Sequence, residues 1–455
     1  MKQETKTQKL DMLHGSMWDK IPRYALPVAA TGILEQLFNA SDIAIVGNFT
    51  GTNKTISVAA VGANSPIIGL ILNLFIGIAL GANVIIANAV GRKDNKTIEK
   101  AVHTSIIMAI IGGILVAIIG ELGIKNLLLM LNVPKDVLPY ALLYIRIYLL
   151  GMPAILLYNF EAAIFRSIGE TKVPLKALAI SGILNVLFNI FFVVVLKMTV
   201  NGVAIATVIA NVVSSSILFI KLIKSDKSIH INIHTLSFDK DSFKRIMKIG
   251  LPAGVQSAVF AVANIVIQSA INSLGTVVIA ASSAAFNIEI FAYDVLNSFS
   301  QACTTFVGQN YGAGQIKRCK KTLILCLIED AIASALTIIL VLIFGKALLS
   351  IFNNNPQVIK LGYTRLLMVF SAYIFSMIYE NMSGYLRGFG ISLIPAILTI
   401  IGVCVVRVIW IYTIFPLHRT FSTILMAYPI SLSITALLIF ITLIIYKPSK
   451  KLIKK

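Results

Sequence analysis

The chain has 455 residues, of which 57% are hydrophobic and only 13% are charged. Soluble domains carry about 25% charged residues, so this composition excludes an ordinary soluble protein and predicts a polytopic membrane protein. The net charge of +20 does not indicate a nucleic-acid partner, because the basic residues form short clusters between apolar segments. Their expected partner is the anionic face of the lipid bilayer.

Residues 1–20 form a polar N-terminal segment that lacks the apolar core of a cleavable signal peptide. The rest of the chain contains apolar segments that exceed the roughly 20 residues a helix needs to cross a bilayer. Twelve are predicted, at about 21–48, 56–88, 101–124, 138–162, 174–196, 201–223, 246–272, 276–307, 322–345, 358–385, 392–416 and 420–446. The connections are short except for a polar stretch at 224–245, and a basic tail follows at 447–455.

Basic residues are distributed unevenly between the two sides of these spans. The termini and the even-numbered connections carry 29 of them, whereas the odd-numbered connections, with Arg365 among them, carry 8. Because Lys and Arg are retained in the cytoplasm, we expect both termini to be cytoplasmic in a multi-pass protein of the plasma membrane.

The second half of the chain repeats the first at an offset of about 221 residues. FRSIGETKVP at 165–174 returns as LRGFGISLIP at 386–395. Each half holds six spans, so both halves enter the membrane from the same side and form a parallel repeat. We predict an all-α fold of twelve transmembrane helices in two six-helix lobes related by a two-fold axis along the membrane normal. The N-lobe is expected at 21–223, the linker at 224–245 and the C-lobe at 246–446.

The first span carries carboxylates where water is scarce. Asp42 lies about 20 residues into the span, and Glu35 and Asn39 share its helix face. A carboxylate at the bilayer centre costs at least about 2.5–3.5 kcal/mol, so an unpaired one indicates function. The alternative is a structural group satisfied by neighbouring hydroxyls. Pro27 removes a backbone hydrogen bond in the same span and predicts a helix bend.

Two further polar stripes follow at four-residue spacing. They comprise Ser181, Asn185 and Asn189 in the fifth span and Thr207, Asn211 and Ser215 in the sixth. Such residues commonly serve as contacts between membrane helices. Taken together with Asp42, they predict an oxygen-rich site for a proton or a small hard cation.

The second half carries acidic candidates of its own, namely Glu289 and Asp294 in the eighth span and Glu380 in the tenth. Asp294 and Glu380 match asparagines in the first half, so the halves are not chemically equivalent.

Three other acids and one base also lie in or near spans. Glu161, Glu329 and Asp330 are expected to be solvated near the cytoplasmic ends of their spans. Arg407 lies deep in the eleventh span and requires a counter-ion.

Several classes of protein are excluded by what the sequence lacks. It contains no GxxxxGK[ST] motif, so no ATPase subunit is expected, and no HExxH or GxSxG motif that would indicate an enzyme. The four cysteines show no CxxC spacing and the five histidines are scattered, so no metal cofactor is predicted. Transport would therefore run on an ion gradient, with H⁺ or Na⁺ as the coupling ion.

With these features in register, the chain resembles the multidrug and toxic compound extrusion (MATE) family over roughly residues 20–446. The stretches that carry the resemblance are ALP and SDIAIVG in span 1, NVLFN in span 5, FRSIGETKVP and LRGFG after spans 4 and 10, and VGQNYGAG after span 8. The resemblance implies a secondary active transporter, a cation-coupled antiporter that expels amphipathic, often cationic drugs, antibiotics included. It also implies a V-shaped cleft between two lobes that opens alternately to each side.

The resemblance further implies that Asp42 takes the coupling ion, with Asn185 and Thr207 as partners. In the family a second aspartate follows on the fifth helix, where this chain has Asn189. The site would then carry one formal charge, and a Na⁺ at Asp42, Asn185 and Thr207 would be held more weakly. Neutralisation of Asp42 would let span 1 bend at Pro27 and release the drug.

Rival functions are weighed on the same residues. A lipid-linked oligosaccharide flippase shares this architecture but needs a cleft lined by basic residues, whereas only Arg146 and Arg407 lie within the spans. A membrane enzyme needs a His, Asp or Glu cluster at a membrane edge, which the sequence lacks. A scaffold or receptor needs neither the duplication nor the intramembrane acids.

Overall fold

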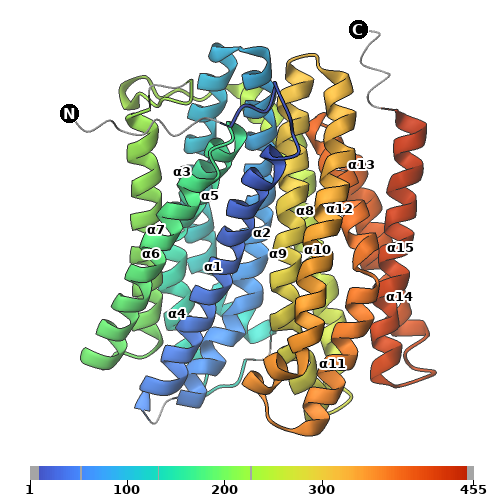
Figure 1. Cartoon of the computed structure of the whole chain (residues 1–455). Coiled ribbons are helices and arrows are strands. Elements are labelled where there is room, and N and C mark those ends of the chain that lie inside the picture. Colours follow the sequence, from blue (N-terminus) through green and yellow to red (C-terminus); the bar gives the residue numbers. More distant parts are fainter. Residues whose placement is uncertain (1–9, 52–53, 132, 226–227, 448–455) are drawn as a thin grey trace. The chain divides into compact units, whose positions relative to one another are not determined.

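The computed structural model describes residues 10–51, 54–131, 133–225 and 228–447. All regular structure in these residues is helical, and no strand occurs among them (Figure 1). Helices satisfy every backbone N–H and C=O internally, which an apolar chain in a bilayer requires because lipid offers no hydrogen-bond partners.

The first six predicted spans are formed by eight helical elements. They are α1 (Lys20–Phe49), α2 (Lys54–Arg92), α3 (Asn95–Met130), α4 (Leu138–Leu150), α5 (Met152–Ser167), α6 (Lys172–Asn189), the π-helical turn η2 (Ile190–Val195) and α7 (Val200–Ile223). A short 3-10 turn, η3 (Ile233–Thr235), lies in the predicted linker.

The last six predicted spans follow the same order of elements, with one further short helix after the π-helical turn. They are α8 (Lys240–Asn272), α9 (Thr276–Gly312), α10 (Ile316–Phe352), α11 (Pro356–Ser371), α12 (Tyr373–Gly388), α13 (Leu393–Thr399), the π-helical turn η4 (Ile400–Val405), α14 (Val406–Thr413) and α15 (Phe421–Tyr446). A π-helical turn therefore interrupts the fifth span of each half.

The described residues contain nine continuous helical stretches that are long and apolar enough to cross a membrane, and two bent pairs that qualify together. The pairs are α4 with α5, bent by 51°, and α11 with α12, bent by 46°. The first predicted span, α1, is not among these stretches; its 30 residues extend about 45 Å at the rise of an α-helix and carry the carboxylates of Glu35 and Asp42. The predicted all-α fold with twelve spans is confirmed.

The bend between α4 and α5 has a local cause. Gly151 separates the two helices, and Pro153 occupies the first turn of α5, where it has no N–H to donate back into α4. α5 also approaches α3 closely, because a Cβ on Gly113 would overlap the backbone of Pro153. The absence of a side chain at Gly113 is what lets these two helices touch.

The described chain divides into two compact units. Unit 1 comprises Met1–Ala29, Ala87–Lys93 and Leu251–Lys455, and unit 2 comprises Ala30–Ile86 and Asp94–Gly250. The division passes through α1, α2 and α8 rather than through the linker at 224–245. The lobe boundaries drawn from the sequence stay a prediction.

The segment that precedes α1 is held in place by contacts within unit 1. Met12 and Met17 are buried among apolar side chains of α9 and α10. Arg318 Nη1 donates to the carbonyl oxygen of Gly15 (3.0 Å), and its Nη2 donates to that of Met12 (3.2 Å). The polar composition of the first 20 residues gave no indication of this contact.

Candidate functional site

Asp42 of α1 lies inside unit 2 with only 6% of its surface exposed. Asn189 Nδ2, at the end of α6, donates to Asp42 Oδ1 over 2.5 Å. Thr207 Oγ1, on α7, lies 3.1 Å from Asp42 Oδ2. Both partners are neutral, and no basic nitrogen lies within 4.0 Å of the carboxylate in the part of the chain that the structure describes. Asp42 is therefore a buried acid held by neutral donors alone.

The partners of Asp42 are themselves connected. Asn189 Nδ2 also donates to Asn185 Oδ1 (3.1 Å), one helical turn earlier, and Asn185 Nδ2 donates to Thr207 Oγ1 (3.3 Å). The four-residue spacing on α6 puts both amides on the face that meets α1 and α7. The stripes predicted from the sequence thus meet at one carboxylate.

Two features of this network allow its hydrogen bonds to change partners. Thr207 Oγ1 lies 2.9 Å from the carbonyl oxygen of Val203 as well as beside Asp42, so its single hydroxyl proton serves one acceptor at a time. Asn189 Oδ1 is buried and accepts no hydrogen bond from the described residues. A buried amide oxygen without a hydrogen-bond donor is energetically costly. Asn189 Oδ1 is therefore available to accept a hydrogen bond from a protonated carboxyl group or to bind a cation.

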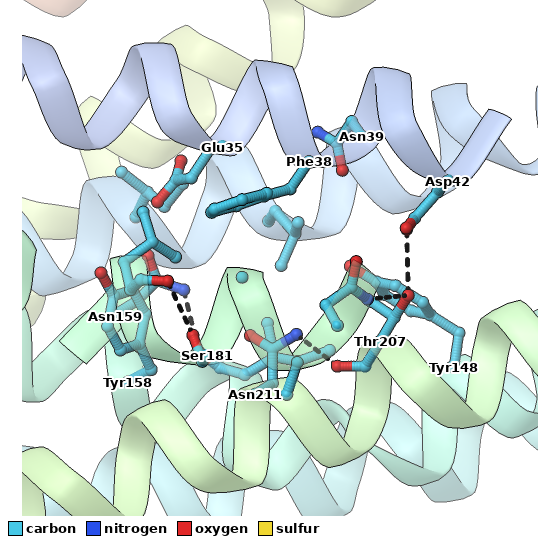
Figure 2. Close-up of a pocket in the computed structure, with 17 residues that line it drawn as sticks. Glu35, Phe38, Asn39, Asp42, Tyr148, Tyr158, Asn159, Ser181, Thr207 and Asn211 are labelled. Atoms are coloured by element: carbon cyan, nitrogen blue, oxygen red, sulfur yellow. Dashed lines mark hydrogen bonds between the residues drawn. The ribbon is translucent and has the colours of Figure 1, made fainter. Parts of the chain in front are cut away.

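A cavity of about 140 Å³ opens beside the carboxylate, within unit 2. Figure 2 shows Glu35, Phe38 and Asp42 of α1 pointing toward Tyr158, Ser181 and Thr207 on the facing helices. Its lining includes four further polar residues predicted from the sequence: Glu35, Asn39, Ser181 and Asn211. The cavity therefore combines two carboxylates with amides, hydroxyls and aromatic rings.

The size of this cavity depends on Gly182 of α6. A Cβ at this position would overlap the ring of Phe38, which lines the cavity from α1. The glycine thus permits α1 and α6 to approach with the ring between them, close to Asn185.

The acidic candidates of the second half lie in unit 1 and do not line this cavity. Glu289 of α9 is bound by Arg365 of α11, whose Nε and Nη2 donate to its two oxygens over 2.8 and 2.9 Å. Glu380 of α12 has one oxygen 4.0 Å from Arg387 Nη1. Asp294 lies on α9. Glu289 and Glu380 thus differ from Asp42 in having a basic neighbour.

The assignment of Arg365 to a connection between spans is wrong. Arg365 lies within α11, and only 3% of its surface is exposed. Besides Glu289, it donates from Nη1 to Ser282 Oγ (2.7 Å). The ion pair with Glu289 links residues 76 positions apart, a pairing that no local pattern reveals.

The expectation that Glu161, Glu329 and Asp330 are solvated is wrong, because all three are buried. Asp330 of α10 accepts hydrogen bonds from Asn381 Nδ2 of α12 (2.6 Å) and from Ser334 Oγ (2.9 Å). Position along a span does not show which face of a helix meets its neighbours. Asp330 and Ser334 lie four residues apart and therefore share one helix face, and this spacing was the sequence signal for a buried polar face.

Comparison with known proteins agrees with this architecture. The family model described as MatE matches residues 27–191 and 252–413. A probable multidrug resistance protein, YoeA of Bacillus subtilis, is 24% identical over 93% of both chains. A probable multidrug resistance protein, NorM of Thermotoga maritima, is 23% identical over 85% of this chain and 83% of its own.

A solved structure supports the fold. An outward-facing multidrug resistance MATE family transporter of the MOP superfamily superimposes with a TM-score of 0.90 at 22% identity, covering 98% of this chain and all of the other. The family model spans most of both halves, and the structural match spans nearly the whole chain. The chain belongs to the MATE family of membrane efflux transporters.

Proposed function

We propose that this transporter is an antiporter that exports amphipathic, often cationic drugs across the plasma membrane by alternating access and takes up H⁺ or Na⁺ at Asp42 in exchange. The multidrug names of its relatives support drugs as the cargo. The observation that carries the proposal is the Asp42 carboxylate, buried beside a cavity with neutral donors only.

The energetic case rests on the cost of an unpaired buried charge. A carboxylate at the centre of a bilayer costs at least about 2.5–3.5 kcal/mol, and here no basic group offsets it. Two hydrogen bonds from Asn189 and Thr207 recover part of this cost. Binding a cation or a proton removes the remainder, so occupancy of the site changes the stability of its surroundings.

The network gives each state of the carboxylate its own set of contacts. When Asp42 is charged, Asn189 Nδ2 and the Thr207 hydroxyl donate to it. When Asp42 is protonated, it donates to an acceptor such as Asn189 Oδ1, which an amide rotation presents, and Thr207 turns to the Val203 carbonyl. α1, α6 and α7 are thereby repacked. Exchange follows if drug and cation favour opposite packings.

The oxygen set also suits Na⁺ as a transported ion. Asp42 contributes both carboxylate oxygens, and Asn185 Oδ1 and Thr207 Oγ1 lie in the same cluster. Small hard cations prefer oxygen ligands. Asn189 adds no charge, so the site carries one formal charge and favours a monovalent cation or a proton over a divalent ion.

Ethidium transport in everted membrane vesicles tests this proposal, with a pH gradient and a Na⁺ gradient imposed separately. The wild-type protein should move ethidium under one of the two gradients. Asp42→Asn keeps the shape of the side chain but cannot be charged, so it should reduce gradient-driven transport to the level of vesicles without the protein.

The matched control for this change is Asp136→Asn, which removes an exposed carboxylate in the connection before α4. It should transport like the wild type. Transport by Asp42→Asn at the wild-type rate, with equal amounts of protein in the membrane, would rule the proposal out.

A further inference from the structure

Arg407 is a buried cation in the second half of the chain. It lies on α14, directly after the π-helical turn η4, and only 4% of its surface is exposed. Its guanidinium carbon lies 4.3 Å from the centre of the Tyr428 ring on α15. The Arg407 Nε donates to Ser431 Oγ, one turn further along α15, over 3.0 Å. Stacking and one hydrogen bond are the contacts that orient it.

These contacts leave most of the guanidinium without acceptors. Of its five N–H groups, the one on Nε is used, and Nη1 and Nη2 donate no hydrogen bond to the described residues. No carboxylate oxygen lies within 4.0 Å of Arg407 in the same part of the chain. A buried charge in this state is strongly unfavourable unless something else pairs with it.

The neighbouring Arg365 shows what full pairing looks like in the same unit. Its Nε and Nη2 bind Glu289 and its Nη1 binds Ser282. It lies against the same ring, with its guanidinium carbon 5.6 Å from the centre of Tyr428. The two arginines and Tyr428 thus bring two positive charges together with one carboxylate, and the excess positive charge resides on Arg407.

The internal repeat explains why no acid is available to Arg407. At the offset of 221 residues, Asp42 and Thr207 of the first half match Ala263 and Tyr428. Ala263 is buried in an apolar cluster with Tyr379 and Cys404. The position that supplies the carboxylate in unit 2 is therefore apolar in unit 1, and the polar group that remains is a base.

We propose that Nη1 and Nη2 of Arg407 bind a carboxylate carried by an amphipathic cargo molecule. The free edge formed by Nη1 and Nη2 of a planar guanidinium matches a carboxylate bidentately, and a water-poor surrounding strengthens such a pair. This inference rests on the proposed export function and names one substrate class for it: aromatic amphiphiles that carry both a positive charge and a free carboxylate.

The test is binding of rhodamine B and of its ethyl ester to purified protein in phosphatidylcholine nanodiscs, measured by fluorescence anisotropy without any ion gradient. The two dyes differ only in the free carboxylate. The wild-type protein should bind rhodamine B more tightly. Arg407→Gln should weaken rhodamine B binding about tenfold or more and leave the ester unchanged, as expected for loss of a charge-assisted hydrogen-bond pair.

Two further variants control the measurement. Arg407→Lys keeps the charge but loses the planar fork, so its preference for rhodamine B should lie between those of the wild type and Arg407→Gln. Arg419→Gln removes a base from the exposed connection between α14 and α15 and should bind both dyes like the wild type. Because Arg407→Gln removes an uncompensated buried charge, it should unfold at no lower temperature than the wild type.

Equal binding of the two dyes by the wild type, or an equal loss of both in Arg407→Gln, would overturn the inference. A second contradicting result would be that the wild type binds both dyes equally and that phosphatidylglycerol stabilises the wild type but not Arg407→Gln. That result would assign Arg407 to a lipid headgroup. Because the assay contains no gradient, a loss of ethidium export would bear on the proposed function and not on this site.

Discussion

At the scale of single residues, the site is defined by the difference between Asp42 and the other buried acids. Glu289 has a bidentate arginine. Asp330, like Asp42, accepts from an amide (Asn381 of α12) and a hydroxyl (Ser334 of α10), but it does not line the cavity. Asp42 has two neutral donors and an open cavity at its side. An acid that is buried, unpaired and reachable from a cavity can change its occupancy without breaking an ion pair.

Asn189 offers the sharpest single substitution. Asn189→Asp replaces the donor to Asp42 by a second carboxylate at hydrogen-bonding distance. Two adjacent carboxylates cannot both be charged at neutral pH without a cation, so they share a proton. The pH of half-maximal ethidium transport should rise by about one unit or more. An unchanged pH profile, with Asn48→Asp as the exposed control, would contradict the role given to Asn189.

At the scale of helices, the close approach of α1 and α6 depends on Gly182. Gly182→Ala adds a methyl group where the Phe38 ring lies, so the ring must rotate or the helices must separate. The cavity beside Asp42 should change shape, and the rate of ethidium transport should fall several-fold while the protein still inserts. Gly69→Ala on α2 is the matched control, because a Cβ there meets no atom within 4 Å.

A surface ion pair stabilises the start of α8, and its contribution depends on pH. Asp239 accepts hydrogen bonds from Lys100 Nζ (2.8 Å) and from the backbone N–H of Ser242 (2.8 Å). The Lys100 hydrogen bond and then the Ser242 backbone hydrogen bond lower the pKa of Asp239 from 3.8 to about 2. A lowered pKa means that the stabilisation is present above the unfolded value and is lost as the pH falls through about 2.

Asp239→Asn should therefore lower the unfolding temperature of the detergent-solubilised protein at neutral pH, and the difference from the wild type should shrink as the pH is lowered below about 4. The neighbouring Asp241→Asn, which removes an exposed acid, should show no such dependence. A difference that grows toward low pH would contradict the assignment.

At the scale of the whole molecule, periodicity and composition predicted the architecture well. Twelve apolar stretches, the repeat around Pro174 and Pro395, and the polar stripes on the fifth and sixth spans all depend on local patterns that a sequence displays directly. Asp42, Asn185, Asn189 and Thr207 meet because those stripes face one another. The match of the family model to both halves of the chain agrees with these patterns.

What the sequence left open depends on contacts between distant residues. Three contacts join positions more than 50 residues apart: Arg365 pairs with Glu289, Asp330 is bound by Asn381, and Arg318 binds the carbonyl oxygens of Met12 and Gly15. Hydropathy identifies a span but not the neighbour that each of its faces meets. The unpaired guanidinium of Arg407 also became visible only once its surroundings were known.

The most direct test of cation exchange at Asp42 is to record H⁺ and Na⁺ fluxes in proteoliposomes when ethidium is added to one side. The wild-type protein should show a flux of one of these ions that depends on ethidium and runs opposite to it. Asp42→Asn should bind ethidium and show no coupled flux. A coupled flux in Asp42→Asn equal to that of the wild type would contradict the account, because the exchange would then proceed without the carboxylate.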